Sequence, residues 1–145
     1  MPVTSELDAV RARRTARELA LQLGFSPSDV EAIVIATSEL AINLARYASG
    51  GTITLAAVEH SGRRGLRLES HDSGPGISDL AAAQRDGFST GGGLGGGLGG
   101  VRRLMDELTI TSSASGTHAV ATKWLPADTP GEMKPVARVK IARRG

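Results

Sequence analysis

The sequence lacks cysteine and is poor in aromatic residues, with only four in a chain of 145. The absence of cysteine excludes a disulfide scaffold, a zinc site with thiolate ligands and a thiol nucleophile, and it suits a reducing compartment. No apolar run approaches the roughly 20 residues that a membrane-spanning helix needs. The N-terminus also lacks the basic and then apolar order of a signal peptide, so we expect a cytoplasmic protein without a membrane partner.

The length fits one domain of ordinary size, which can bury enough surface to fold without metal or disulfide support. With so few aromatic side chains, the core must be built from Ala, Val, Leu and Ile. We expect this domain to occupy residues 1–125. Residues 126–145 are expected to form a basic, flexible tail.

The net charge of +2 is unevenly distributed. Residues 126–145 carry five Lys or Arg against two Asp or Glu, so the basic excess belongs to the tail and not to the domain. Nucleic-acid binding requires a basic face, preferably with stacking aromatic side chains, and the aromatic residues of this chain are scattered. We therefore expect no nucleic-acid partner. His60, His71 and His118 are not clustered in the sequence, and they are expected to be surface or strand residues rather than metal ligands.

Two amphipathic helices are predicted at the N-terminal end. Residues 6–23 place Ala and Leu on one stripe and Arg on another, and a glycine follows. A second helix begins with Ser26 as N-cap, Pro27 in the first helical position and Asp29 placed for a capping box. It is expected to run to about residue 48.

The remainder of the domain predicts strands and two further helical stretches. Residues 52–59 and 66–70 read as a hairpin whose turn contains Gly62 and Gly65. A short helix is predicted at 78–86, and the helical stretch after the glycine tract is expected to carry the apolar residues Val101, Leu104, Met105 and Leu108. Strands at 109–113 and 117–125 complete the order, which predicts an α+β fold with a mostly antiparallel sheet and helices on one face.

Glu39 and Asn43 are the first candidate site residues. They are four apart on the second predicted helix, so they project side by side, and their place beside the apolar stripe predicts that both are half buried. A carboxylate and an amide so placed can orient a hydroxyl group and ligate a hard cation such as Mg²⁺. Such a pair is also common in ordinary helices.

The turn that begins at Asp72 is the second candidate. Asp72-Ser73-Gly74-Pro75-Gly76 follows a predicted strand, and its two glycines allow close approach of the backbone to a ligand. An aspartate at the end of a strand can accept a hydrogen bond from an exocyclic amine. The same residues are also typical of a plain surface turn.

The segment from Gly91 to Gly100 is the third candidate. A flexible linker would explain its glycine content, but the tract contains Leu94 and Leu98 at helical spacing and continues directly into a helix. A glycine loop that leads into a helix N-terminus exposes amides that hold phosphates, so we favour phosphate binding. The tract lacks the preceding strand of a dinucleotide-binding fold and the lysine of a P-loop, and the chain lacks the kinase H-R-D signature.

Together, these segments resemble the GHKL (Bergerat-fold) ATPases. Within that superfamily the chain is similar to the anti-sigma-factor serine/threonine kinases, and most closely to the RsbT-type switch kinases of bacterial stress signalling. The resemblance rests on segments that occur in unbroken order between about residues 11 and 125: Ser38–Asn43, Asp72–Gly76, Asp86–Thr90, Gly93–Leu98, Arg103–Glu107 and Gly116–Thr117. It implies a two-layer α/β sandwich with an antiparallel sheet.

The resemblance also implies roles for individual residues. Glu39 would be the general base that accepts the proton of a substrate Ser or Thr hydroxyl, and Asn43 would ligate the Mg²⁺ that bridges the ATP phosphates. Asp72 would accept a hydrogen bond from the adenine amine. The other implied nucleotide contacts are Gly74, Gly76, Thr90, Gly93, Leu94, Gly95, Gly97, Leu98 and Thr117.

By the same resemblance, the partners would be proteins. The expected activity is transfer of the ATP γ-phosphate to a STAS-domain antagonist or scaffold protein, followed by a switch to a PP2C-type phosphatase. The alternative is an anti-sigma factor that sequesters a sigma factor, with ATP as a conformational ligand; a homodimer is compatible with either. The Gly-Phe-Ser-Thr segment that ends at Thr90 favours the switch kinase. A third reading, a non-enzymatic domain with a glycine linker, requires that ATP does not bind.

Overall fold

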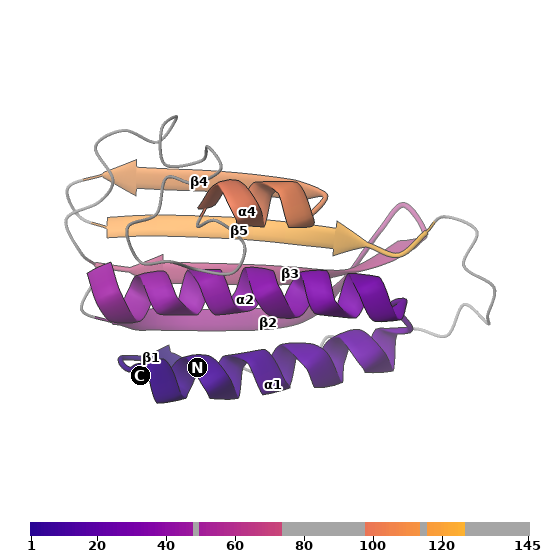
Figure 1. Cartoon of the computed structure of the whole chain (residues 1–145). Coiled ribbons are helices and arrows are strands. Elements are labelled where there is room, and N and C mark those ends of the chain that lie inside the picture. Colours follow the sequence, from indigo (N-terminus) through magenta and orange to yellow (C-terminus); the bar gives the residue numbers. More distant parts are fainter. Residues whose placement is uncertain (48–49, 74–97, 114–115, 127–145) are drawn as a thin grey trace.

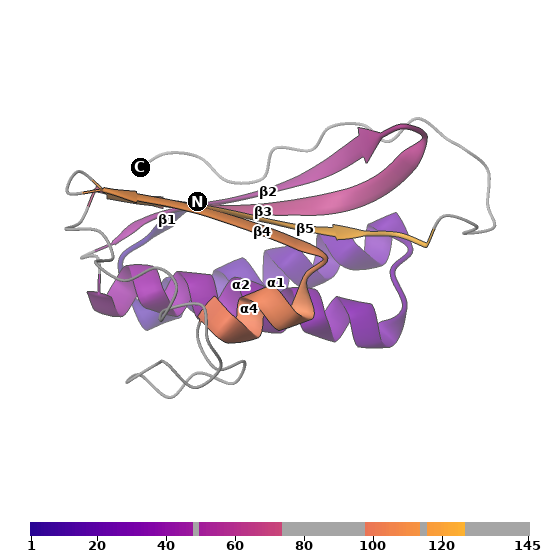
Figure 2. The ribbon, with the colours of Figure 1, turned by 90° about the horizontal axis from the view of Figure 1, so that it is seen from above.

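A five-stranded antiparallel sheet carries three helices on one of its faces (Figures 1 and 2). The computed structural model describes residues 1–47, 50–73, 98–113 and 116–126. The helices are α1 (Glu6–Leu23), α2 (Pro27–Tyr47) and α4 (Leu98–Leu104). The strands are β1 (Pro2–Val3), β2 (Gly51–His60), β3 (Arg63–Asp72), β4 (Glu107–Ser113) and β5 (Gly116–Trp124), in the spatial order β1-β2-β3-β5-β4. This confirms the predicted α+β class with antiparallel strands and helices on one face.

Local capping residues mark both ends of α1 and the start of α2. The Ser5 hydroxyl accepts a hydrogen bond from the Asp8 amide at the start of α1, and Gly24 ends that helix with a left-handed φ of 92°. Ser26 caps α2, since its hydroxyl accepts a hydrogen bond of 3.2 Å from the Asp29 amide. The end of α1 and the start of α2 therefore lie where the sequence predicts, because Gly24 and Ser26 each provide a local hydrogen bond for the helix terminus.

Strand register decides which side chains face the helices. In β3, Leu66, Leu68 and Ser70 are buried, whereas the residues between them point to the opposite face of the sheet. None of the described helices covers that second face, which we call the open face (Figure 2). The core lies between the helices and the covered face, and it is built mainly from Ala, Val, Leu and Ile, as the composition predicts.

Three pairs of polar side chains link α1 to α2: Arg17 with Glu31, Glu6 with Arg46, and Arg13 with Ser38. Arg17 on α1 forms a bidentate ion pair with Glu31 on α2, and the hydrogen bond from Arg17 lowers the pKa of the Glu31 carboxyl. Because the pKa is lowered in the folded state, this link stabilises the fold above the ordinary pKa of Glu and is lost as the pH falls. Both side chains are substantially exposed, so the contribution is small.

Several predicted boundaries are wrong. The β2–β3 turn consists of Ser61 and Gly62, both with positive φ, and Gly65 lies inside β3 rather than in the turn. A Cβ at Gly65 would lie 2.7 Å from Cε3 of Trp124, so glycine leaves room there for the indole of the neighbouring strand. Leu108 belongs to β4 and not to a helix, and the two-residue strand β1 was not predicted. The predicted helix at 78–86 and the tail beyond residue 126 lie outside the described residues.

No helix among the described residues combines the length and the apolar character that crossing a bilayer requires.

A buried leucine of the sheet and an exposed leucine of α1 form a matched pair for a stability test. Leu68 is 0% exposed at the centre of the sheet, whereas Leu21 on α1 is 60% exposed. We expect Leu68→Ala to lower the free energy of unfolding by about 2–5 kcal/mol, because it loses buried apolar surface and leaves a cavity. Leu21→Ala should change it by less than about 0.5 kcal/mol. Urea denaturation measures both, and equal losses would contradict the assigned core.

Candidate functional site

The polar segment of α2 is deeply buried. Thr37, Ser38 and Glu39 are 0%, 4% and 2% exposed, although they lie in a helix whose other inward residues are apolar. The Thr37 hydroxyl donates a 2.8 Å hydrogen bond to the carbonyl of Ile33, and the Ser38 hydroxyl accepts one of 3.2 Å from Arg13 on α1. Burial of three consecutive polar side chains is costly, and such a cost is typical of a functional position.

Glu39 is more buried than predicted, whereas Asn43 is half buried as predicted. The expectation that both would be half buried is therefore wrong for Glu39. The reason is that α2 packs on the sheet and on α4 at the same time, so its inward face is wider than the apolar stripe in the sequence indicates. Asn43 follows one helical turn later on the same helix.

Asp72 and Thr117 lie directly opposite each other at the ends of β3 and β5. Both are on the covered face, in line with the buried Leu68 and Ser70. The hydroxyl of Thr117 lies 3.0 Å from that of Ser112, its register partner in β4. One row across three strands thus presents a carboxylate and two hydroxyls toward the helices.

Two glycines bring the chain close to Asp72. A Cβ at Gly116 would lie 2.0 Å from the Asp72 carbonyl oxygen, and Gly116 has a φ of +144°. A Cβ at Gly51 would lie 2.8 Å from Cδ2 of Leu44 in α2 and 3.2 Å from Cβ of Asp72. The C-terminal part of α2 and the end of β3 therefore meet around Gly51.

Leu98, the remaining described candidate, is the first residue of α4 and belongs to the core. The start of α4, the end of β3, the start of β5 and the C-terminal part of α2 lie toward the same end of the sheet (Figure 1). The structure thus gathers Glu39, Asn43, Asp72, Leu98 and Thr117 on one side of the sheet. The other predicted residues lie outside the described part of the chain: Gly74, Gly76, Thr90, Gly93, Leu94, Gly95 and Gly97.

Ser112 was missed in the sequence. It could have been found from the alternation of side chains along β4. This alternation places Leu108, Ile110 and Ser112 on the covered face and exposes the residues between them. Recognising it requires the correct start of β4, and the sequence interpretation had assigned Leu108 to a helix.

The polar side chains of the candidate site could supply only a small part of the coordination shell of a cation, and bound phosphates and water would have to supply the rest. Within the described ranges, no group of three or more His, Asp or Glu side chains is arranged to hold a metal ion. A half-buried amide oxygen such as that of Asn43 is a suitable single protein ligand for Mg²⁺, which usually keeps waters and substrate phosphates in its shell. The residues present therefore fit Mg²⁺ that arrives with ATP.

Two of the histidines, His71 and His118, are strand residues, as predicted, but they lie side by side in space although they are far apart in the sequence. The rings of His71 and His118 are register partners with centroids 5.7 Å apart, and Nε2 of His118 lies 2.9 Å from Oε2 of Glu69. The sequence could not show this, because the two residues come from strands that are far apart in the chain. They face the open side of the sheet, away from Asp72 and Thr117, so they are strand residues outside the site.

Known proteins resemble this chain over most of its length. Residues 3–123 match the model of the histidine kinase-like ATPase domain family. The chain is 47% identical over 124 residues to the serine/threonine-protein kinase RsbT of Bacillus subtilis (strain 168), an alignment that covers 85% of this chain and 93% of that protein.

Two solved structures align with this chain over only part of their own length. The RsbU and RsbW domains of Rv1364c from Mycobacterium tuberculosis align with a TM-score of 0.58 and 24% identity, over 92% of this chain and 35% of that chain. The histidine kinase domain of the blue-light activated histidine kinase EL346 from Erythrobacter litoralis aligns with a TM-score of 0.46 and 25% identity, over 66% of this chain and 47% of that one. The chain thus spans about a third and about half of their lengths, respectively.

The close approach of Gly116 to Asp72 can be tested with two Gly→Ala variants. Gly116→Ala and Gly62→Ala both place a side chain at a positive φ, which costs about 1–3 kcal/mol of stability. We expect only Gly116→Ala to weaken ATP binding, by roughly tenfold or more, because the added Cβ displaces the Asp72 backbone. Gly62 lies in the turn at the other end of β3, and its added Cβ would meet nothing within 4 Å.

Isothermal titration with Mg·ATP measures the binding, and thermal unfolding measures the stability. Equal ATP affinity of the two variants would contradict the placement of Asp72 in the site.

Proposed function

The chain belongs to the histidine kinase-like ATPase family, and from this membership we propose that it is an ATP-dependent protein serine/threonine kinase that works by partner switching. The observation that carries the proposal is the buried carboxylate of Glu39, one helical turn from Asn43, on the same side of the sheet as the row formed by Asp72 and Thr117. The 47% sequence identity to a serine/threonine-protein kinase, over 93% of the length of that protein, supports the reaction class.

Glu39 is proposed to act as the general base. The substrate Ser or Thr oxygen attacks the γ-phosphorus of ATP, the bond from that phosphorus to the β–γ bridging oxygen breaks, and ADP leaves. The proton of the attacking hydroxyl passes to the Glu39 carboxylate. Burial on α2 restricts the orientation of this carboxylate and keeps bulk water away from it, so a substrate hydroxyl that reaches it meets a positioned acceptor.

Asp72, Thr117 and Asn43 are proposed to hold the nucleotide. Asp72 accepts a hydrogen bond from the adenine amine, and the hydroxyl of Thr117, oriented by Ser112, binds at the same end. The amide oxygen of Asn43 would hold Mg²⁺, which would neutralise charge on the phosphates. The glycine tract is proposed to contact the phosphates through backbone amides, as its sequence indicates.

The protein substrate is proposed to be a STAS-domain antagonist protein, and the partner after phosphorylation a PP2C-type phosphatase. The support is the likeness to RsbT. The observation that favours the second candidate, sequestration of a sigma factor, is the fold shared with a structure that contains an RsbW domain. The two functions differ in which protein the chain retains after ATP is consumed.

The general base can be tested with Glu→Gln variants on one helix. Glu39→Gln keeps the size of the side chain but removes its ability to accept a proton, so phosphate transfer from Mg·ATP to a STAS-domain partner should fall by roughly 10²–10⁴-fold. ATP binding should persist. The control is Glu31→Gln, an exposed position on α2 that should leave the rate unchanged. Undiminished transfer by Glu39→Gln would exclude Glu39 as the base.

The proposed contact between Asp72 and adenine is tested by ATP affinity rather than by the rate of phosphate transfer. Asp72→Asn removes the negative charge and replaces one carboxylate oxygen with an NH2 group, which donates instead of accepting. ATP affinity should therefore fall by about tenfold or more, the value of a hydrogen bond to a charged group. Titration calorimetry measures the affinity, and ATP binding of wild-type strength would remove Asp72 from the nucleotide site.

The partner protein can be identified by a pull-down before and after addition of ATP. Recovery of a sigma factor instead of a phosphatase would favour the second candidate.

A further inference from the structure

Lys123 is the only lysine in residues 1–126, and it lies in an unusual place. Its register partner in β3 is the fully buried Leu66, so its side chain points from β5 to the covered face of the sheet. The side chain is only 12% exposed. A lysine is rarely buried to this extent unless its ammonium group has partners.

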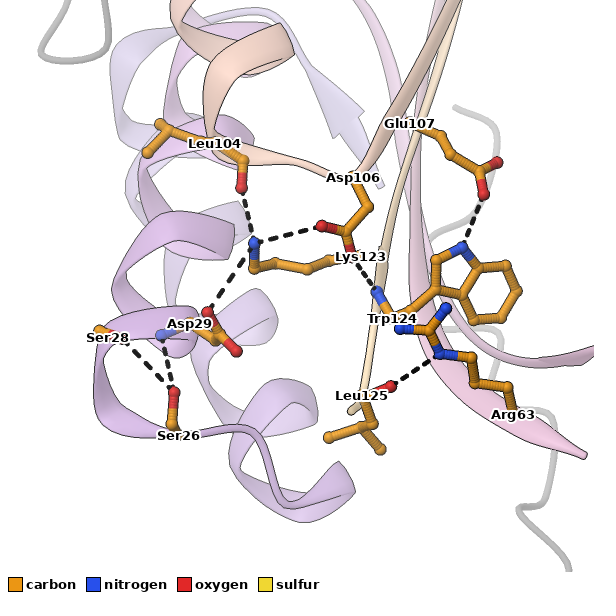
Figure 3. A network of polar contacts seen from close by, with 10 residues as sticks. All are labelled: Ser26, Ser28, Asp29, Arg63, Leu104, Asp106, Glu107, Lys123, Trp124 and Leu125. Atoms are coloured by element: carbon orange, nitrogen blue, oxygen red, sulfur yellow. Dashed lines mark hydrogen bonds and ion pairs between the residues drawn. The ribbon is translucent and has the colours of Figure 1, made fainter. Parts of the chain in front are cut away.

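The ammonium group of Lys123 joins three elements (Figure 3). Its Nζ donates a 2.8 Å hydrogen bond to the carbonyl of Leu104, the last residue of α4. It also lies 3.8 Å from Oδ1 of Asp29 in the first turn of α2 and 3.9 Å from Oδ1 of Asp106, just before β4. One cation therefore ties the end of α4 to the start of α2 and to the sheet.

The carboxylate of Asp106 is itself held in place. Its Oδ2 accepts a 2.7 Å hydrogen bond from the Trp124 amide (Figure 3). The Asp106 amide donates one of 2.9 Å to the carbonyl of Thr122. Lys123 thus contacts a carboxylate that the backbone of β5 holds in place. A cation at the last carbonyl of a helix is also favoured by the helix dipole.

The helix α4 depends on such external support. It has only seven residues, two of which are glycine, and neither its length nor its composition stabilises a helix in isolation. Packing through Leu98 and Val101 holds it against the core, and Lys123 holds its last carbonyl. The core contacts of Leu98 and Val101 and the hydrogen bond from Lys123 therefore hold α4 together, with Lys123 acting at its C-terminal end.

We propose that Lys123 is a positioning residue for nucleotide binding, which fixes α4 from its C-terminal end so that Leu98 stays at the nucleotide site. The inference rests on the proposed function for the role of Leu98, whereas the anchoring of α4 rests on the contacts alone. Loss of the anchor raises the Kd for ATP, because binding must then order α4. It leaves the rate at saturating ATP unchanged, because Glu39 and Asn43 lie more than two helical turns beyond Asp29, the residue of α2 that Lys123 contacts.

The test compares two neighbouring positions of β5 in the full-length protein. Lys123→Met removes the ammonium group but keeps the apolar stem. Trp124→Phe removes the 2.7 Å hydrogen bond from the indole Nε1 to Glu107 on the open face. The indole also lies near His60 and Arg63, and none of these three partners belongs to α4. Both lower stability, which thermal unfolding followed by circular dichroism measures.

Only Lys123→Met should raise the Kd for Mg·ATP, by about tenfold, as expected for a residue that acts on a site without contacting the ligand. It should also speed hydrogen exchange of the α4 amides in the nucleotide-free protein. With ATP at saturation, phosphate transfer to the STAS-domain partner should match the wild-type rate. If Lys123→Met does not fold, Lys123→Gln, which keeps a polar end group, is used in the same comparison.

The outcomes separate the two proposals. An unchanged Kd and unchanged α4 exchange in Lys123→Met, with wild-type protein that binds ATP, would overturn the role of Lys123 alone. An equal rise in Kd for Lys123→Met and Trp124→Phe would reduce that role to general stability and overturn it as well. Wild-type protein that binds no ATP would overturn the proposed function, and the positioning role together with it.

Discussion

The three helices that the structure describes all cover the same face of the antiparallel sheet, and most other features of the described residues depend on this arrangement. Because side chains alternate along a strand, a shift of one residue in register would exchange the covered and open faces. The register of β3 and β5 places Asp72, Thr117 and Lys123 toward the helices, and it places His71 and His118 on the opposite side. A single geometric constraint thus places the candidate site residues of β3 and β5 on one side of the sheet.

The helices were predictable because their signals are local. Ser26 and Pro27 start α2 through groups that are adjacent in the sequence, and Glu39 and Asn43 share a helix, so their proximity follows from helical geometry alone. What could not be predicted depends on contacts between distant segments. Gly65 resembles a turn residue until Trp124 is placed over it, and the extent of Glu39 burial depends on how α2 meets the sheet and α4.

Asp72, Thr117 and Lys123 show the same limit within the site. The turn after Asp72 and the segment that contains Thr117 could each be recognised, but that the two residues are directly opposite follows only from the β3–β5 pairing. Lys123 carries no sequence signal, since an isolated lysine in a strand is ordinarily a surface residue. Its partners Asp29, Leu104 and Asp106 are brought to it by three separate elements.

The single tryptophan of the chain occupies an instructive place. Trp124 follows Lys123 directly, yet its indole lies on the open face, over Gly65 and hydrogen-bonded to Glu107. Its fluorescence therefore comes from one defined position, separated by the thickness of the sheet from Asp72 and Thr117. A protein that covers the open face would change this emission directly, whereas a nucleotide would change it only through the backbone of β5, so one intrinsic fluorophore distinguishes the two kinds of binding event.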